Sequence, residues 1–513
     1  MMPNANGSTP QSVNAYIKSV CDIMRRANCA GALQYVPELT WMLFLRILDD
    51  REEEDAARAR AVGQPFTPSL AAPYRWRDWA ARSGPKREQL SGKGSTSGDF
   101  FRFVDLDLLP SIRDMYKRPD ATPRQKVVSQ VFSGVQRTRI DTERNLLDII
   151  DKLDALQPDS VDDTHVFTLS QVYEGLLLKM GEKNNDGGQF FTPREIIRAM
   201  IRAVNPRVGE TVYDPAAGTG GFLAQANELM RPEAEKLGPH ALQRLGERTF
   251  YGREKDDLAY PIALANLVLH GIDEPHIWHG NTLTGQEVYA GLWEGAPPLF
   301  DVVLTNPPFG GKEGPEAQTR FAYKTRSTQV LFLQEVLEKL KEGGRCGIVV
   351  DEGFLFRANE NAFVQTKRKL LDEFDVWCIV SLPAGLFINA GAASKTNLLF
   401  FTKGPPTESI WYYDLSDIKV TKRQPFTLDR FDEFFQLLPG RKDSERSWSV
   451  SAAGLKAKNY DLKAVNPTRK SVEDTRTPED LLAIIEDKGR EIEAAVADLH
   501  ATLPKNANSR ITP

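Results

Sequence analysis

The chain has 513 residues, 41% of them hydrophobic and 26% charged, so it is long enough for two or three domains with buried cores and is not a disordered tail. Its net charge of -5 excludes a protein that coats nucleic acid without sequence preference, because such affinity comes from neutralised phosphates. The four cysteines show neither zinc-ligand spacing nor a disulfide pattern, so we expect no metal site and a reducing, cytoplasmic location.

The first region of the chain is predicted to be helical. Residues 1–10 are polar and lack the apolar core of a signal peptide. Apolar residues then recur at three- and four-residue spacing, and the most apolar stretch, Trp41–Leu48, is too short to cross a membrane and contains Arg46. We therefore expect a helical domain over residues 1–165, interrupted by a loop over residues 82–99, and no membrane association.

A change of pattern follows the polar segment 184–188. Short apolar runs now alternate with helical stretches, which is typical of a mostly parallel, doubly wound α/β sheet. We expect a Rossmann-like α/β domain over residues 166–405 with a seven-stranded sheet. The expected strands lie near residues 211–213, 249–251, 277–279, 302–304, 346–350, 376–382 and 398–402.

A strand, a glycine-rich turn and a helix start follow one another in residues 211–222. Glycines let the backbone approach a ligand closely, and a helix N-terminus offers free N–H groups. The turn lacks the P-loop lysine and the G-x-G-x-x-G spacing, which argues against nucleoside triphosphates and dinucleotides. Glu254 ends the next strand, where a carboxylate can accept both hydroxyls of a ribose. Together, the turn and Glu254 predict a ligand site.

The apolar run 301–305 ends abruptly in Asn306, Pro307, Pro308 and Phe309. Because proline cannot donate to a sheet ladder, the strand must stop and expose Asn306 and its carbonyl neighbours at the end where open α/β sheets bind ligands. The Asn306 oxygen and the Pro307 carbonyl can accept the hydrogens of a ring-attached amine and favour the pyramidal form that attacks a methyl group. We expect Phe309 to stack on the base that carries this amine.

The glycine turn resembles a known motif. The segment Asp214–Phe222 (DPAAGTGGF) resembles the S-adenosylmethionine motif of amino-methylating DNA methyltransferases, and Gln189–Arg194 (QFFTPR) is similar to the companion motif that closes over the methionine part of that cofactor. The latter can equally be a helix start with Thr192 as N-cap and Pro193 as first residue. Asn281 stands where the family usually has an aspartate near the adenine. The candidate cofactor-binding residues are Gln189, Phe190, Phe191, Thr192, Pro193, Arg194, Asp214, Ala216, Gly218, Thr219, Gly220, Gly221, Glu254 and Asn281.

Most of the chain resembles the methyltransferase subunit of type I restriction-modification systems, through the order of these motifs, the N-terminal helices, and the segments 381–387 and 395–401. The resemblance implies N6-adenine methylation of double-stranded DNA with S-adenosylmethionine as donor. It also implies two such subunits on one DNA-specificity subunit, and optional association with a translocating restriction subunit. Where the family usually shows Pro-Asp-Gly, this chain has Asp351, Glu352 and Gly353, and we assign neither acid to catalysis.

The last region, residues 406–513, is mixed and is predicted to end in one long helix with Thr477 as N-cap and Pro478 as first residue. Its apolar residues form a seam close to a heptad, so the helix packs either on its own domain or on a partner. The seam consists of Leu481, Ile485, Ile492, Val496, Leu499 and Leu503.

Two other functions are compatible with the motifs. Asn-Pro-Pro-aromatic also serves methylation of glutamine amides and guanine amines in related folds, which makes a protein-glutamine or RNA methyltransferase the runner-up. A catalytically silent scaffold subunit of a defence complex is the third. The intact glycine turn and Asn306 disfavour the silent subunit. We expect a partner to read the DNA target, so the sequence predicts neither the target nor a preference for hemimethylated DNA.

Overall fold

The computed structural model describes residues 10–27, 29, 32–61, 63–92, 95–96, 98–155, 192–387, 395–421, 424–467 and 477–502. By their internal contacts, Met1–Val465 form one compact unit and Asn466–Pro513 a second. The candidate site residues that the structure describes all belong to the first unit. Gln189, Phe190 and Phe191 lie outside the described residues.

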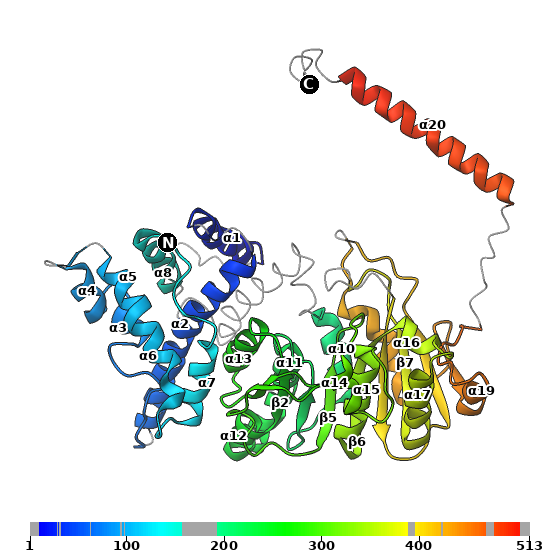
Figure 1. Cartoon of the computed structure of the whole chain (residues 1–513), viewed down its shortest axis with the longest axis horizontal. Coiled ribbons are helices and arrows are strands. Elements are labelled where there is room, and N and C mark those ends of the chain that lie inside the picture. Colours follow the sequence, from blue (N-terminus) through cyan, green and yellow to red (C-terminus); the bar gives the residue numbers. More distant parts are fainter. Residues whose placement is uncertain are drawn as a thin grey trace, which may run out of the picture. The chain divides into compact units, whose positions relative to one another are not determined.

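The N-terminal part of the first unit is helical, as predicted (Figure 1). The apolar stretch Trp41–Leu48 lies within helix α2 and is buried. The prediction of a loop over residues 82–99 was wrong in part, because Pro85 follows Gly84 as the first residue of a helix and Arg87 donates to the Ala80 carbonyl (2.8 Å). The helices are α1 (Pro10–Arg26), α2 (Ala32–Ala61), α3 (Trp76–Trp79), α4 (Pro85–Ser91), α5 (Asp99–Phe103), α6 (Leu109–Arg113), α7 (Pro123–Val131) and α8 (Glu143–Asp154).

A ten-stranded sheet forms the centre of the α/β part, in the order β10-β9-β7-β8-β6-β5-β1-β2-β3-β4. All seven predicted strands are present, and β4, β9 and β10 are additional. The pairs β3/β2, β2/β1, β1/β5, β5/β6 and β7/β9 are parallel, whereas β8 runs antiparallel to both β6 and β7. The strands are β1 (Val212–Asp214), β2 (Phe250–Glu254), β3 (His276–Gly280), β4 (Glu287–Tyr289), β5 (Phe300–Thr305), β6 (Leu340–Asp351), β7 (Phe374–Ser381), β8 (Thr396–Lys403), β9 (Ser409–Asp414) and β10 (Ser447–Ser451).

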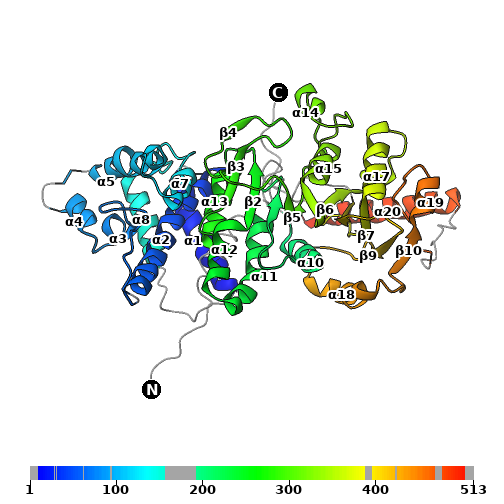
Figure 2. The ribbon, with the colours of Figure 1, turned by 90° about the horizontal axis from the view of Figure 1, so that it is seen from below.

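Helices cover both faces of this sheet (Figure 2). Helices α10 and α11 lie on one face and α15 and α17 on the other. Because both faces are covered, strands such as β5 and β8 are buried nearly throughout and read as continuous apolar runs. The helices of this part are α10 (Arg194–Val204), α11 (Gly221–Leu237), α12 (Pro239–Arg248), α13 (Ala259–Leu269), α14 (Pro315–Thr319), α15 (Thr328–Lys339), α16 (Glu352–Phe356), α17 (Asn361–Glu373), α18 (Asp432–Leu437) and α19 (Ala452–Ala457).

Helix α13 connects the helical N-terminal part to the sheet. The guanidinium of Arg51, on α2, donates to the carbonyls of Val268 and Leu269 at the C-terminal end of α13, with a distance of 2.7 Å to Leu269. One turn earlier, the Asn266 side chain donates to the Thr219 carbonyl (2.9 Å) in the glycine turn. The same helix therefore contacts both the N-terminal helices and the candidate cofactor turn.

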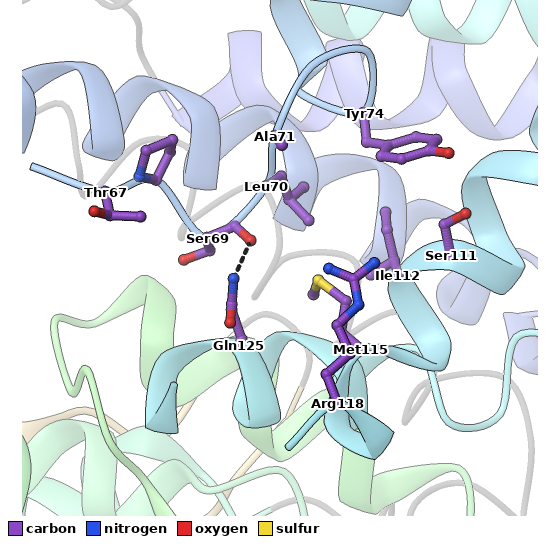
Figure 3. A pocket seen from close by; sticks show the side chains of 11 residues that line it. Thr67, Ser69, Leu70, Ala71, Tyr74, Ser111, Ile112, Met115, Arg118 and Gln125 are labelled. Atoms are coloured by element: carbon purple, nitrogen blue, oxygen red, sulfur yellow. Dashed lines mark hydrogen bonds between the residues drawn. The ribbon is translucent and has the colours of Figure 1, made fainter. Parts of the chain in front are cut away.

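A pocket of about 240 Å³ lies among the N-terminal helices, as Figure 3 shows. On one side, Gln125 donates to the Ser69 carbonyl (3.1 Å). Its lining comes from residues between Thr67 and Gln125, so none of the candidate site residues contributes to it.

The second unit contains helix α20 (Pro478–Thr502), which begins as predicted. The Thr477 hydroxyl accepts from the Asp480 N–H (3.2 Å), and the Asp480 carboxylate accepts from the Thr477 N–H (2.9 Å). Neither α20 nor any other helix in the described part of the chain is long and apolar enough to cross a membrane.

Candidate active site

The glycine turn lies between β1 and α11 at the carboxyl end of the parallel strands. Gly218 and Gly220 have positive φ angles of 54° and 76°, which other residues adopt at a cost. A Cβ at Gly220 would also lie 3.1 Å from the Leu267 side chain on α13. Gly220 and Gly221 then begin α11, whose N-terminus offers free N–H groups at the turn. The backbone therefore has the form required to approach a ligand closely.

Asp214 is the last residue of β1, with 1% of its surface exposed. Its Oδ1 accepts from the Ala216 N–H (3.0 Å) and from the Thr305 hydroxyl (2.7 Å). Burial raises the pKa of Asp214 to about 7, although both hydrogen bonds favour the charged form. The carboxylate thus connects the glycine turn to the end of β5, directly before Asn306.

Glu254 ends β2, and its carboxylate contacts the glycine turn. Oε2 accepts from the Gly218 N–H (2.8 Å), and Oε1 accepts from the N–H groups of Lys255 (2.9 Å) and Asp256 (2.8 Å). Burial raises the pKa of Glu254 to about 7. Since each oxygen has two acceptor positions, Oε2 retains one for a ribose hydroxyl, whereas Oε1 is saturated. The pair of ribose contacts predicted for Glu254 therefore requires one of these backbone bonds to break.

Asn306 follows β5, and its amide is held at one end only. Nδ2 donates to the Thr192 hydroxyl (2.9 Å), whereas Oδ1 is buried and has no hydrogen-bond partner among the described residues. A buried acceptor without a partner costs free energy, so it is a strong indication of a ligand position. This unpartnered Oδ1 is the atom that the sequence analysis predicts to accept a hydrogen bond from the target amine.

The three residues after Asn306 differ in exposure. Pro307 is buried, Pro308 is exposed and Phe309 is half-buried. The Phe309 ring meets Phe387 edge to face, with centroids 6.0 Å apart and planes at 87°. Phe309 therefore has one aromatic neighbour and a part of its surface open for another.

The described end of the segment 189–194 lies against this strand end. The expectation that Thr192 caps the following helix was wrong, because α10 has Pro193 as N-cap and Arg194 as first residue. The Thr192 hydroxyl instead accepts from Asn306. Burial lowers the pKa of Arg194 to about 10, while Glu228 opposes this, so the guanidinium stays charged at neutral pH.

Asn281 lies in the loop after β3. Its Oδ1 accepts from the N–H groups of Leu283 (3.0 Å) and Thr284 (3.3 Å). The adjacent Thr282 hydroxyl donates to the Pro215 carbonyl (2.7 Å), which ties this loop to the cofactor turn. An aspartate would accept the same two bonds, so the turn tolerates either residue.

The two acids at the end of β6, Asp351 and Glu352, have structural partners. Asp351 is the N-cap of α16, where Oδ1 accepts from the Phe354 N–H (2.6 Å). Glu352 pairs with Lys463 (3.0 Å). Within the described ranges no group of three or more histidine, cysteine, aspartate or glutamate side chains is placed to hold a metal.

Two residues of this site were missed by the sequence reasoning. Thr305 is fully buried and joins Asp214, and Asn266 is 1% exposed and joins Thr219. Asn266 carries a recognisable signal, because it is the one amide in the otherwise apolar helix Ala259–Leu269, and a buried amide needs partners. Thr305 carries none, since threonine is common in strands.

Comparison with known proteins places this geometry in a family. The N-6 DNA Methylase family matches residues 164–476, and the HsdM N-terminal domain family matches residues 13–153. The chain belongs to the N-6 DNA methylase family. It is 33% identical over 500 residues to the type I restriction enzyme EcoEI methylase subunit of Escherichia coli, covering 94% of this chain and 95% of that one. It is 30% identical to the StySPI methylase subunit of Salmonella potsdam, covering 82% and 74% of the two chains.

Solved structures agree with this membership. A modification subunit of a putative type I restriction enzyme from Vibrio vulnificus YJ016 has 31% identity and a TM-score of 0.77, covering 91% of this chain and 99% of that one. A chain from a study of complex assembly and conformational transition in the type I R-M system has 36% identity and a TM-score of 0.73, covering 98% and 100%. This N-6 DNA methylase is therefore an S-adenosylmethionine-dependent, adenine-specific DNA methyltransferase of the type I methylase-subunit class.

Proposed function

We propose that Asn306–Phe309 form the half of the site that receives the adenine amine, and that the glycine turn with Glu254 forms the half that receives S-adenosylmethionine. The observation that carries this proposal is the buried, unpartnered Oδ1 of Asn306 beside a fixed Nδ2. The positive-φ glycines and the carboxylate at Gly218 fit the cofactor. Gln189, Phe190 and Phe191 keep their predicted cofactor role as part of this proposal.

S-adenosylmethionine supplies an activated methyl group when bound. The chain's own residues prepare the amine, whose lone pair is delocalised into the adenine ring. Asn306 Oδ1 and the Pro307 carbonyl accept hydrogen bonds from its two hydrogens, which favours the pyramidal amine and stabilises the positive charge that develops on nitrogen until one of these hydrogens leaves as a proton. Phe309 stacks on the adenine after the base leaves the duplex. No covalent intermediate with the protein is required.

The net charge of this chain indicates that another subunit reads the DNA sequence. A chain of net charge -5 gains little from phosphate neutralisation over its surface as a whole, so we infer that a DNA-specificity subunit supplies sequence reading. Two methylase subunits bind one specificity subunit, and a translocating restriction subunit joins them where one is present. We assign the specificity-subunit contact to α20, whose seam residues Ile485, Ile492 and Val496 are 66%, 64% and 46% exposed.

The proposed organisation is a helical domain over residues 1–165, a methyltransferase domain over 166–405 and a partner-binding region over 406–513. The sheet runs on past residue 405 through β9 and β10, so part of the third region completes the second. All four cysteines are buried and none forms a disulfide, which supports a cytoplasmic location.

Methyl transfer tests this function directly. The purified chain with its specificity subunit is given tritiated S-adenosylmethionine and equal amounts of unmethylated duplex DNA, RNA and protein. We expect label only in DNA, recovered as N6-methyladenine after digestion. Label on protein or RNA and none on DNA would favour the runner-up. A folded complex that binds DNA and transfers nothing would favour the silent scaffold.

Cofactor binding is expected to depend on pH through Glu254. Because the pKa of this carboxyl is raised to about 7, it is mostly protonated at pH 6 and mostly charged at pH 8. The charged form accepts a ribose hydroxyl better, so the affinity for S-adenosylmethionine should rise with pH. Calorimetry should show a Kd about tenfold lower at pH 8 than at pH 6, the ratio of the ionised fractions. Glu254→Gln should bind more weakly and lose this slope. A full slope in the variant would assign the titration elsewhere, Asp214 being the first alternative.

A further inference from the structure

The hydroxyl of Thr192 is connected to the candidate catalytic residue. Thr192 precedes α10 and accepts from Asn306 Nδ2 across a sequence separation of 114 residues (2.9 Å). It does not cap its own helix, whose N-cap Pro193 offers no side-chain bond. In the described residues, Asn306 is therefore the one hydrogen-bond partner of this hydroxyl, and helix capping does not explain it.

An asparagine amide has two ends with opposite properties. Its oxygen accepts hydrogen bonds, and its nitrogen carries two hydrogens and only donates. An adenine amine in transfer must meet the oxygen, because the nitrogen would set donor against donor. A rotation of the amide by 180° exchanges the two ends with little change of shape. Asn306 must therefore present Oδ1, and not Nδ2, to the amine.

One contact holds the Asn306 amide, and another holds the strand end before it. Thr192 accepts the amide hydrogen, which keeps the amide in one plane with Oδ1 buried and free. Thr305, the preceding residue, is fully buried and its hydroxyl donates to Asp214 (2.7 Å). The strand end and the plane of the amide are thus both held before the adenine arrives, so the reaction need not reorganise them.

We propose that Thr192 is a positioning residue that holds the Asn306 amide in the plane in which Oδ1 is open to the target amine. This inference rests on the proposed role of Asn306 and changes the role predicted for Thr192 from cofactor binding to catalysis through another residue. Thr192 belongs to the segment Gln189–Arg194, which is expected to close over the cofactor.

The test uses two variants that differ only in the hydroxyl, Thr192→Ser and Thr192→Ala, in the complete complex with the specificity subunit. Single-turnover methyl transfer to unmethylated duplex DNA gives the rate of the chemical step, and calorimetry gives the Kd for S-adenosylmethionine. We expect Thr192→Ala to lower the rate about 10- to 100-fold, because the Nδ2 donor loses its partner and the plane of the amide is no longer held. Thr192→Ser should stay within about threefold of wild type, and the Kd of both variants should be unchanged.

Three results would overturn the inference. Equal rates for Thr192→Ala and wild type would mean that the hydroxyl does not matter. Equal losses in the serine and alanine variants would mean that the methyl group and packing matter instead. A weaker cofactor Kd with an unchanged rate would return Thr192 to the cofactor site. These results are distinct from failure of the proposed function, in which the wild-type complex itself transfers nothing to DNA. Thr192→Val, which preserves the volume, replaces Thr192→Ala if the latter lowers the melting temperature.

Discussion

Asn306→Ala is expected to lower the single-turnover rate of methyl transfer to DNA by about 1000-fold or more. The substitution removes the one side-chain acceptor that binds the amine hydrogens, and acceptors of this kind act at the transition state, where removal of one costs about 100- to 1000-fold. Misplacement of the amine adds to this loss, because the Pro307 carbonyl alone cannot fix it. Binding of S-adenosylmethionine should be unchanged, because the hydrogen bond of the Asn306 side chain goes to Thr192 and not to the glycine turn.

Two further variants make this measurement specific. Asn306→Asp keeps an acceptor but removes the donor to Thr192, so it should retain more activity than Asn306→Ala. Asn361→Ala, an exposed asparagine on α17, is the matched control and should behave as wild type. If Asn306→Ala transfers methyl groups at the wild-type rate, the assigned mechanism is wrong even though the family membership stands.

The triple substitution of Ile485, Ile492 and Val496 by glutamine should abolish binding of the specificity subunit. Glutamine preserves helix propensity, so α20 remains a helix. Each apolar anchor buried in an interface contributes about 2 kcal/mol, and three together correspond to a loss of more than about 1000-fold in affinity. Co-purification and sedimentation of the mixed subunits measure the complex. Methylation of DNA should be lost with it.

The control lies on the opposite side of the same helix. Asp487 and Arg490 form an exposed ion pair (3.4 Å), and their joint replacement by alanine should leave the complex intact, because exposed pairs contribute little. A triple variant that still binds the specificity subunit with wild-type affinity would contradict the assignment of this interface to α20.

The strands that could be predicted are those whose burial on both faces leaves a continuous apolar run. β5 and β8 are examples, and each was found within two residues. β4 was missed because it is a three-residue edge strand with Glu287 and Val288 exposed, which shows no pattern. β9 was missed for another reason. Ser409–Asp414 has the apolar residues of a strand, but the expected sheet had seven strands and these were all assigned before residue 409.

The site shows a similar division between local and distant contacts. The glycine turn and the Asn-Pro-Pro strand end could be located because the backbone conformation of each is determined by adjacent residues. The contacts of Asn306 with Thr192 and of Thr305 with Asp214 join residues 114 and 91 positions apart, and no pattern in one sequence records such pairs. For the same reason the bond from the Gly218 N–H to Glu254, 36 positions away, was not foreseen.

Helix α13 contacts both the N-terminal helices and the glycine turn, so binding at one of these places can affect binding at the other. Its last carbonyls hold Arg51 of the N-terminal helices, and its Asn266 holds the turn that receives the cofactor. A ligand that favours one position of this helix must favour it at both ends, and the effect is reciprocal. DNA that repositions the N-terminal helices would change the affinity for S-adenosylmethionine, and S-adenosylmethionine would change the affinity for that DNA by the same factor. Any coupling between DNA binding and cofactor binding through this helix would thus be heterotropic and equal in both directions.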